Sequence, residues 1–323
     1  MPEPGPPTRT APAAPAETSG STAPAVAVRG LVKRYPGDVG VLGVDLDIGR
    51  HQVFGLVGPN GAGKTTLLSL LCGLTVPDAG SVVLPGRFAL CPDAPEFEPW
   101  LTGAEVLRQS FALARPGEPL GSGRLDEIAS VTGIETYVRR RCGGYSRGMT
   151  QRLGIAAALV LDPDVLVLDE PTSALDAVGR ADVLALIRRL SRQRTVLLSS
   201  HTLSDVQRVA DTIAVMDTGK MLFTGPPQVL IDEYLRPAWR VVLTGCAAGA
   251  ARTLAGRPEV REVRTRSARE LDVEFATVAA GEEHLVPILA GLGVGVTSVA
   301  PVDADLESAF LALTGRTRQD GDR

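Results

Sequence analysis

The chain has 323 residues, which is enough for one large α/β domain and a small second domain. Its formal net charge of −4 provides no overall attraction to nucleic acid, so we expect no nucleic-acid partner. No apolar run is long enough to span a bilayer. The 4 cysteines are scattered without a C-x-x-C pair, which is typical of core or incidental thiols in a reducing cytosol.

The N-terminal segment, residues 1–25, is rich in Pro, Ala, Ser and Thr. Such a composition cannot bury enough surface to order itself, so we predict a disordered tail. The segment has no apolar core of the kind that secretory signals need. Ordered structure is expected from residue 26, with strands at Val26–Val28 and Leu31–Tyr35. The alternation over Val41–Ile48 predicts a half-buried antiparallel strand.

Three short apolar segments predict buried strands, and each is followed by polar residues capable of chemistry. They are Val53–Val57, Val165–Leu168 and Thr195–Ser199. This arrangement suits a parallel sheet whose strands end at a ligand. Between the first two strands, residues 99–162 form a more helical section.

The pattern changes near residue 237, where a second domain is predicted over residues 237–315. Its expected elements are strand, helix, strand, strand, helix and strand at 239–244, 247–256, 260–265, 270–275, 281–292 and 294–299. This βαββαβ order predicts a small α+β, ferredoxin-like domain. An amphipathic helix over Asp305–Leu313 closes it, and residues 316–323 are predicted to be a flexible tail.

The most specific motif joins the first buried strand to a Leu-rich helix. It reads Gly58-Pro59-Asn60-Gly61-Ala62-Gly63-Lys64-Thr65-Thr66. In this context G-x-x-x-x-G-K-[ST] predicts a phosphate-binding loop, whose backbone N–H groups and helix N-terminus face phosphate oxygens. We expect Lys64 to bind the β- and γ-phosphates, Thr65 to bind Mg²⁺ and Thr66 to contact the α-phosphate side. The sequence therefore predicts binding of a nucleoside triphosphate.

A second motif, Asp169-Glu170-Pro171, directly follows the strand Val165–Leu168. A carboxylate at the end of a buried strand is suited to hold Mg²⁺, and we assign this role to Asp169. The adjacent Glu170 is predicted to polarise the attacking water as a general base.

Four motifs occur in a fixed order: GPNGAGKTT, YSRGMTQR over Tyr145–Arg152, LVLDEPTSALD over Leu166–Asp176, and His201 after a strand. Together they resemble the ATPase subunits of ABC transporters over about residues 26–230. The resemblance implies a P-loop NTPase fold of the α/β class, with an ABC nucleotide-binding domain over residues 26–236 and a helical subdomain over about 99–162. It also implies a head-to-tail dimer that holds each ATP between one domain's phosphate loop and the other domain's signature motif.

The resemblance assigns further roles residue by residue. Tyr35 is at the position of the ring that stacks on adenine. Ser146 and Gly148 of the signature motif face the γ-phosphate bound to the second copy. Asp176 closes the D-loop Ser173-Ala174-Leu175-Asp176, which couples the two sites, and His201 corresponds to the switch histidine that contacts the γ-phosphate.

The chain departs from the family pattern at two places. Arg147 and Met149 replace a glycine and a glutamine of the usual LSGGQ signature. Arg147 either adds charge at the phosphate or, as we favour, points toward the partner surface or acidic neighbours. Asp93 replaces the Q-loop glutamine, where it is either a third Mg²⁺ ligand beside Thr65 and Asp169 or a cap for local backbone amides. Arg139-Arg140-Arg141 predicts a solvated basic face near the signature.

We therefore predict the ATP-hydrolysing subunit of an ABC transporter, using ATP and Mg²⁺. The C-terminal LESAFLALTG resembles drug-export and antibiotic-resistance ATPases, which implies an exporter. A separate permease would dock over residues 93–145 and hold the subunit in the cytoplasm at the inner face of the membrane. Two alternatives are a soluble ABC-type ATPase acting on ribosomes or DNA, and a regulatory subunit that does not hydrolyse ATP. The single motif set and the lack of sustained heptads argue against the first, and Glu170 against the second.

Overall fold

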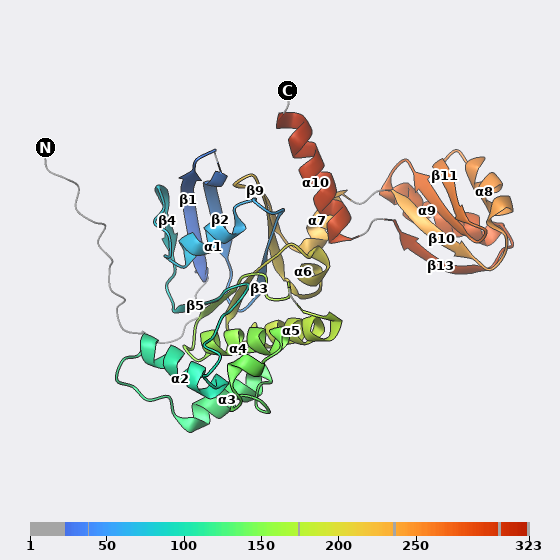
Figure 1. Ribbon diagram of the computed structural model, residues 1–323. Coiled ribbons are helices and arrows are strands. Elements are labelled where there is room, and N and C mark those ends of the chain that lie inside the picture. The colour runs from blue at the N-terminus through green and yellow to red at the C-terminus, as the bar shows by residue number, and fades with distance from the viewer. Residues whose placement is uncertain (1–22, 38, 174, 235–236, 303–304, 322–323) are drawn as a thin grey trace, which may run out of the picture. The chain divides into compact units, whose positions relative to one another are not determined.

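The computed structural model describes residues 23–37, 39–173, 175–234, 237–302 and 305–321, with side chains to residue 315 in the last helix (Figure 1). Outside this part lie residues 1–22 of the predicted N-terminal tail, the D-loop residue Ala174, the domain boundary at 235–236 and residues 322–323. The predicted tail extends too far at its end, because Ala25 is buried and its N–H donates to Ile48 O at 2.7 Å. The chain forms two compact units. One comprises Met1–His201 and Val209–Met221, and the other comprises Thr202–Arg208 and Leu222–Arg323.

The first unit contains an antiparallel sheet of order β2-β1-β4. It consists of β1 (Val26–Tyr35), β2 (Val39–Ile48) and β4 (Ala79–Val83). The antiparallel strand predicted over 41–48 is confirmed. The two strands predicted before it, Val26–Val28 and Leu31–Tyr35, form the single strand β1. Gly30, whose φ is 53°, lies at a shift in the pairing register, and the strand continues through this irregularity. The sequence did not predict β4, which is largely exposed and lacks a buried apolar face.

A second sheet has the order β5-β6-β7-β3-β8-β9. Its strands are β3 (Val53–Val57), β5 (Phe88–Cys91), β6 (Val165–Leu168), β7 (Thr195–Ser200), β8 (Thr212–Asp217) and β9 (Lys220–Gly225). The three predicted strands β6, β7 and β3 are adjacent and parallel, as expected. Every residue of these three strands is buried, because sheets covered on both faces need continuous apolar segments.

Three helices lie in the predicted helical section: α2 (Gly103–Ala114), α3 (Ser122–Thr132) and α4 (Arg147–Leu159), with the short η1 (Cys142–Gly144) before α4. The first unit also contains α1 (Lys64–Leu71) and α5 (Ala177–Leu190), whereas all of α6 (Leu203–Val209) except its last residue belongs to the second unit. A capping box in which Thr102 and Glu105 satisfy each other's backbone N–H groups begins α2. Burial raises the pKa of Cys72 to about 11 and that of Cys91 to about 12, in keeping with the predicted core thiols. In the described residues, no helix is both long and apolar enough to cross a membrane.

After α6 and most of β9, the second unit continues with α7 (Pro227–Tyr234), followed by the βαββαβ order that the sequence predicts. The elements are β10 (Ala238–Leu243), α8 (Ala247–Ala255), β11 (Val260–Ser267), β12 (Glu270–Phe275), α9 (Val278–Gly291) and β13 (Val296–Pro301). The sheet order is β11-β12-β10-β13, with antiparallel pairs throughout. The last helix, α10 (Leu306–Gly321), packs against α7 and continues past Leu313, where the sequence predicted its end, into the predicted flexible tail.

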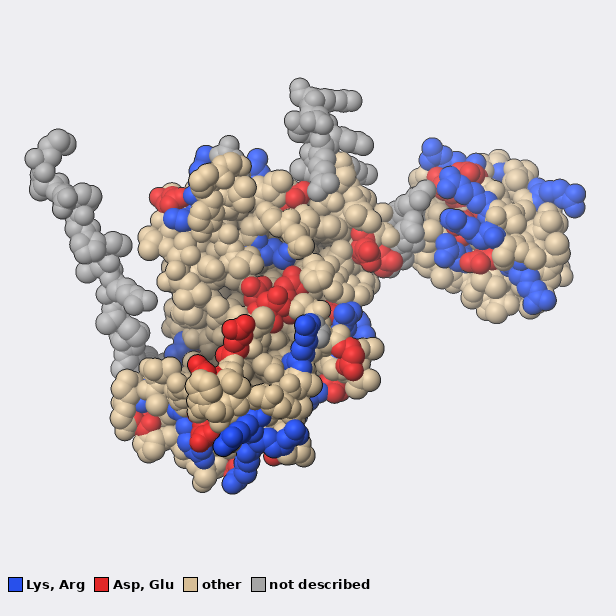
Figure 2. Space-filling view, viewed as in Figure 1, with Lys and Arg blue, Asp and Glu red and all other residues tan. Residues whose placement is uncertain are grey.

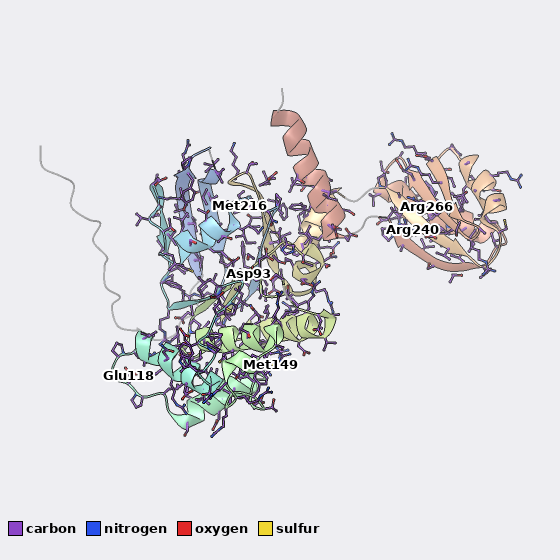
Figure 3. The ribbon with its side chains drawn as sticks, in the orientation of Figure 1. Asp93, Glu118, Met149, Met216, Arg240 and Arg266 are labelled. Atoms are coloured by element: carbon purple, nitrogen blue, oxygen red, sulfur yellow. The ribbon has the colours of Figure 1, made fainter. Side chains whose placement is uncertain are left out.

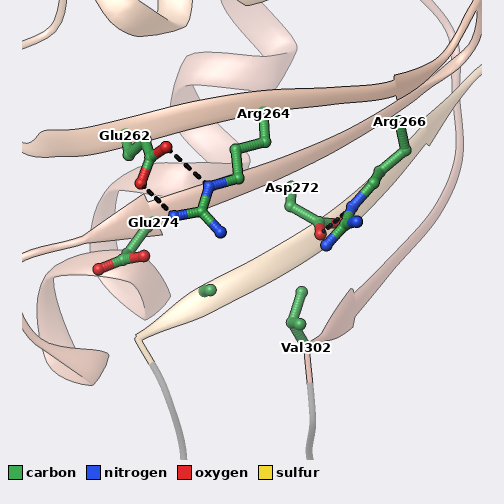
Figure 4. Close-up of a pocket in the computed structure, with 7 residues that line it drawn as sticks. Glu262, Arg264, Arg266, Asp272, Glu274 and Val302 are labelled. Carbon is green, nitrogen blue, oxygen red and sulfur yellow. Dashed lines mark hydrogen bonds and ion pairs between the residues drawn. The ribbon is translucent and has the colours of Figure 1, made fainter.

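One face of this sheet carries the domain core, and the other carries an ion-pair network (Figure 4). Asp272 lies in the network with its side chain only 8% exposed, and it accepts hydrogen bonds from Arg240 Nε at 3.0 Å and Arg266 Nε at 2.8 Å. Burial raises the pKa of Asp272, but the hydrogen bonds from the two guanidinium groups outweigh burial and lower it overall. Arg264 pairs separately with Glu262 through two bonds of 2.7 Å.

The core on the other face depends on close packing between Trp239 and α9. The Trp239 ring meets Phe275 edge to face at 5.5 Å. A Cβ atom at Gly281 would overlap the Trp239 ring, whereas a Cβ atom at Gly291 in the same helix would meet nothing within 4 Å. A glycine is therefore required at 281 by the indole and not by the helix backbone.

We predict that Gly281→Ala lowers the free energy of unfolding of this domain by about 1–3 kcal/mol, the range for overpacking a core. Gly291→Ala is the matched control and should change it little. Urea unfolding followed by tryptophan fluorescence in a Trp100→Phe background reports on Trp239 alone, because the chain has 2 tryptophans. Equal stability of the two variants would contradict the packing argument.

Candidate functional site

The phosphate-binding loop lies between β3 and α1 and is supported by neighbouring backbone. Gly61 and Gly63 have φ angles of 83° and 100°, which favour glycine. A Cβ atom at Gly63 would overlap the carbonyl oxygen of Gly40, and one at Gly58 would overlap that of Met216. The loop is thus shaped by glycines at all three predicted positions, and it leaves backbone N–H groups at the helix N-terminus for an anion.

Lys64 lies inside this loop with only 7% of its surface exposed. Its Nζ donates to the carbonyl oxygens of Gly58 at 2.7 Å and Pro59 at 3.2 Å. Burial lowers the pKa of Lys64, while the charges of Glu170 and Asp169 act in the opposite direction. The ammonium group is therefore held in the loop and lies within electrostatic reach of both predicted catalytic carboxylates.

The two carboxylates are connected by a residue that the sequence did not single out. Ser199 is completely buried in β7, and its Oγ donates to Asp169 Oδ1 at 2.5 Å. The same Oγ accepts the backbone N–H of Glu170 at 2.9 Å. The parallel register, which pairs Leu168 with Leu198, places residues 169 and 199 side by side at the strand ends. The sequence does contain a serine at the end of a second buried strand. Its role becomes apparent only when the pairing register of β6 and β7 is known.

Glu170 and His201 are brought together at the same edge of the sheet. Glu170 Oε2 lies 2.8 Å from His201 Nδ1 and accepts the His201 backbone N–H at 3.3 Å. The Glu170 backbone has a φ of 45°, a left-handed conformation that costs a non-glycine residue about 1–3 kcal/mol. The Glu170 side chain is 15% exposed and that of His201 is 53% exposed. The pair is therefore exposed to solvent mainly on the histidine side.

The signature and D-loop residues occupy two helix N-termini. Ser146 is the N-cap of α4, with its Oγ accepting Met149 N–H at 3.3 Å, and Asp176 caps α5 by accepting Gly179 N–H at 2.8 Å. Gly148 lies in the first turn of α4, where a Cβ atom would make ordinary contact with Leu175. The side chain of Arg147 is exposed and forms no ion pair within the described part of the chain.

Asp93, marked in Figure 3, contacts the D-loop. Ser173 Oγ donates to Asp93 Oδ1 at 2.5 Å, so this carboxylate bonds a side chain rather than the local backbone amides considered above. The two residues line a groove together with Tyr145, Arg147, Gln151 and Leu175. Among the described residues no three His, Cys, Asp or Glu side chains gather as a metal site. Mg²⁺ on a nucleotide needs only one or two carboxylates, because phosphates supply other ligands.

The remaining predicted residues belong to the phosphate-binding loop, to the start of α1 and to the end of β1. Thr65 and Asn60 are exposed, and Pro59 and Thr66 are partly buried. Tyr35 ends β1 with 43% of its surface exposed, and Lys33 Nζ lies 6.0 Å from its ring centroid. An exposed ring on a strand end is free to stack on a planar ligand.

Comparison with known proteins decides the family. A family model described as ABC transporter matches residues 41–173. The Nod factor export ATP-binding protein I of Ralstonia nicotianae is 34% identical, with 93% of this chain and 97% of that protein covered. The daunorubicin resistance ATP-binding protein DrrA3 of Streptomyces coeruleorubidus is 32% identical, with 91% and 97% covered. The chain belongs to the ABC transporter ATP-binding proteins.

Solved structures agree on the fold. CbiO1 of Clostridium perfringens, part of an ABC transporter complex, superimposes with a TM-score of 0.58 at 24% identity over 65% of this chain and 92% of that one. A dimeric ATP-binding cassette bound to ADP and phosphate gives 0.56 at 21% identity, over 62% and 98%. The predicted P-loop NTPase fold is thus confirmed for the nucleotide-binding part. As a member of this family, the ABC ATPase uses ATP and Mg²⁺. These relatives give no support to the ribosome, DNA or regulatory alternatives.

We predict that Ser199→Ala lowers ATP turnover by about tenfold or more, because it leaves the Glu170 N–H buried without its acceptor, at a cost of about 1–3 kcal/mol. Ser191→Ala is a suitable control, since Ser191 is also buried but its Oγ donates only to the Arg188 carbonyl oxygen at 3.0 Å. Steady-state phosphate release compares the two. Equal turnover in both variants would show that the Ser199 hydroxyl does not organise the site.

Proposed function

We propose that this ABC ATPase is the ATP-hydrolysing subunit of an exporter and drives a separately encoded membrane permease. The observation that carries the catalytic part is the cluster of Asp169, Glu170, Ser199 and His201 at adjacent strand ends, within electrostatic reach of Lys64. A buried ammonium group, a strand-end carboxylate and a carboxylate–histidine pair are the groups that phosphoryl transfer to water requires.

The residues around the loop fit Mg²⁺·ATP. Gly58, Gly61 and Gly63 shape a loop whose backbone N–H groups can face the phosphates, and Lys64 supplies a positive charge to the β- and γ-phosphates. The loop residues Pro59, Asn60, Gly61, Ala62 and Thr66 complete the cradle. Thr65 and Asp169 would hold Mg²⁺, with Asp93 as a third oxygen ligand, and bound Mg²⁺ supplies charge stabilisation to the phosphate oxygens.

Two side chains are then assigned to hydrolysis, and a third is assigned to binding of the base. Glu170 Oε2 orients the attacking water and takes its proton. His201, hydrogen-bonded to the same Oε2, would contact the γ-phosphate. Tyr35 stacks on the adenine, which tolerates any base and gives modest nucleotide selectivity.

A second copy of the chain completes each site. The exposed N-terminus of α4, with Ser146 and Gly148, would face the γ-phosphate bound by the partner, and Asp176 would lie at the D-loop contact between the sites. The dimer of an ATP-binding cassette among the similar structures supports this arrangement. The unpaired Arg147 then lies toward the partner surface.

Export and membrane location rest on the relatives. The names of two relatives that align over nearly the whole chain refer to Nod factor export and daunorubicin resistance. A permease docked over residues 93–145 would hold this subunit at the inner face of the membrane.

The general-base role of Glu170 is tested by Glu170→Gln. It should leave ATP binding intact, abolish turnover and trap an ATP-bound dimer that elutes early in size-exclusion chromatography. Lys64→Ala should instead weaken nucleotide binding, because the buried positive charge is lost. Wild-type phosphate release from Glu170→Gln would rule out Glu170 as the base.

The metal role of Asp93 gives a separate prediction. Asp93→Gln should keep activity but raise the Mg²⁺ concentration for half-maximal hydrolysis, because a neutral amide binds the ion less strongly, and Asp93→Ala should cost more. Ser173→Ala is the control, since it removes the observed hydrogen bond and leaves the carboxylate. If Mg²⁺ titrations of both Asp93 variants match wild type, Asp93 is not a metal ligand. An effect shared with Ser173→Ala would assign Asp93 to holding the D-loop.

A further inference from the structure

The chain leaves the catalytic cluster through the short helix α6. His201 directly follows β7, and α6 begins at Leu203, so Thr202 alone lies between the histidine and the helix. The His201 side chain is 53% exposed, and its ring contacts Glu170 through one nitrogen. Packing covers only about half of this side chain, so its place beside Glu170 also depends on where the backbone enters α6.

The position of α6 is determined largely by the second unit. Residues Thr202–Arg208 form a compact unit with Leu222–Arg323, whereas His201 belongs to the first unit. Val206, in the middle of α6, is completely buried. The helix that follows the catalytic histidine is therefore a part of the C-terminal structure.

One hydrogen bond joins α6 to the last helix of the chain. Gln207 Oε1 accepts the Leu306 N–H at 3.0 Å, across 99 positions of the sequence. Leu306 is the first residue of α10 and is completely buried. The first N–H groups of a helix have no partner within the helix, and Asp305 satisfies a different one by accepting the Ser308 N–H at 2.8 Å. Without Gln207, a buried donor at the start of α10 would lose its observed acceptor.

The charged groups of the second unit serve a different purpose. Figure 2 shows side chains of both charges gathered over the domain that contains β10–β13. There Arg240 on β10 and Arg266 on β11 both pair with Asp272 on β12, so these ion pairs hold strands of one sheet to one another. The bond between Gln207 and Leu306 is neutral and instead connects the helix next to His201 with α10.

We propose that Gln207 is a positioning residue for His201. By accepting the Leu306 N–H, Gln207 fixes α6 to the start of α10, and α6 holds the backbone that presents His201 to Glu170. Because α10 packs against α7, the C-terminal helices and β7 together set the position of the histidine. The proposal rests on the proposed role of His201 at the γ-phosphate. It gives the C-terminal structure a part in ATP turnover without any contact with the nucleotide.

The test compares steady-state phosphate release by full-length variants over a range of ATP concentrations. Gln207→Leu removes the acceptor from a side chain of similar size, and it should lower kcat about fivefold while the KM for ATP stays near wild type. Gln207→Glu keeps an acceptor oxygen and should restore most of the turnover. Gln228→Leu is the matched control, because Gln228 is also an exposed glutamine of the second unit but donates within α7, to Asp232 at 2.7 Å. Its kcat should match wild type.

A double-mutant cycle shows whether Gln207 acts through His201. His201→Ala should lower kcat by itself, and Gln207→Leu added to it should cause no further loss, because the side chain that is positioned is gone. Wild-type kcat in Gln207→Leu would overturn the proposal, and so would a fivefold loss in both backgrounds, which would make the effect merely structural. Wild-type kcat in His201→Ala would overturn the proposed role of His201 and this proposal with it. The two failures are thereby distinguishable.

Discussion

The parallel register between β6 and β7 is the constraint on which the candidate site depends. Pairing of Leu168 with Leu198 brings Asp169 beside Ser199, and one buried hydroxyl then donates to Asp169 and accepts from the Glu170 backbone. Since both strands are buried on both faces, a slip of one residue would bury the wrong side chains and also separate the carboxylates from the serine. Stability of the sheet and geometry of the site are therefore set by the same hydrogen-bonded ladder.

The position of Glu170 shows what this constraint makes possible. A glutamate with a φ of 45° is unfavourable by itself, and it is held by its N–H bond to Ser199 and its carboxylate contacts with His201. The turn after β6 directs the Glu170 carboxylate to the end of β7 while Asp169 remains bound to Ser199. Asp169 and Glu170 are adjacent but contact different partners. This separation is what the proposed roles require, in which Asp169 binds the metal and Glu170 orients the water.

Sequence reasoning predicted the parts of the fold whose signal is local. The strands β3, β6 and β7 are short, fully apolar and followed by motif residues, and the βαββαβ order of the second domain has clear alternation. It missed β4, whose residues are mostly exposed, and β5, which is only 4 residues long. It also made no prediction for β8 and β9, although β8 is almost entirely buried. In the site, the glycine loop and the acidic pair could be predicted from spacing. Ser199 and the Asp93–Ser173 bond could not, because they join residues 30 and 80 positions apart.

The end of β5 connects the Q-loop to two parts of the site at once. The Cys91 carbonyl accepts the Asp169 N–H at 3.0 Å, and the Cys91 thiol lies 3.8 Å from the Gln151 amide nitrogen in α4. Gly154 of α4 has no room for a Cβ atom, because Pro95 and Cys91 fill the space. The segment from 91 to 95 is thus packed against the signature helix and bonded to the backbone of the strand-end acid. A displacement of this segment has to move α4, strain the Asp169 backbone, or do both, since close-packed side chains leave no free volume to absorb it.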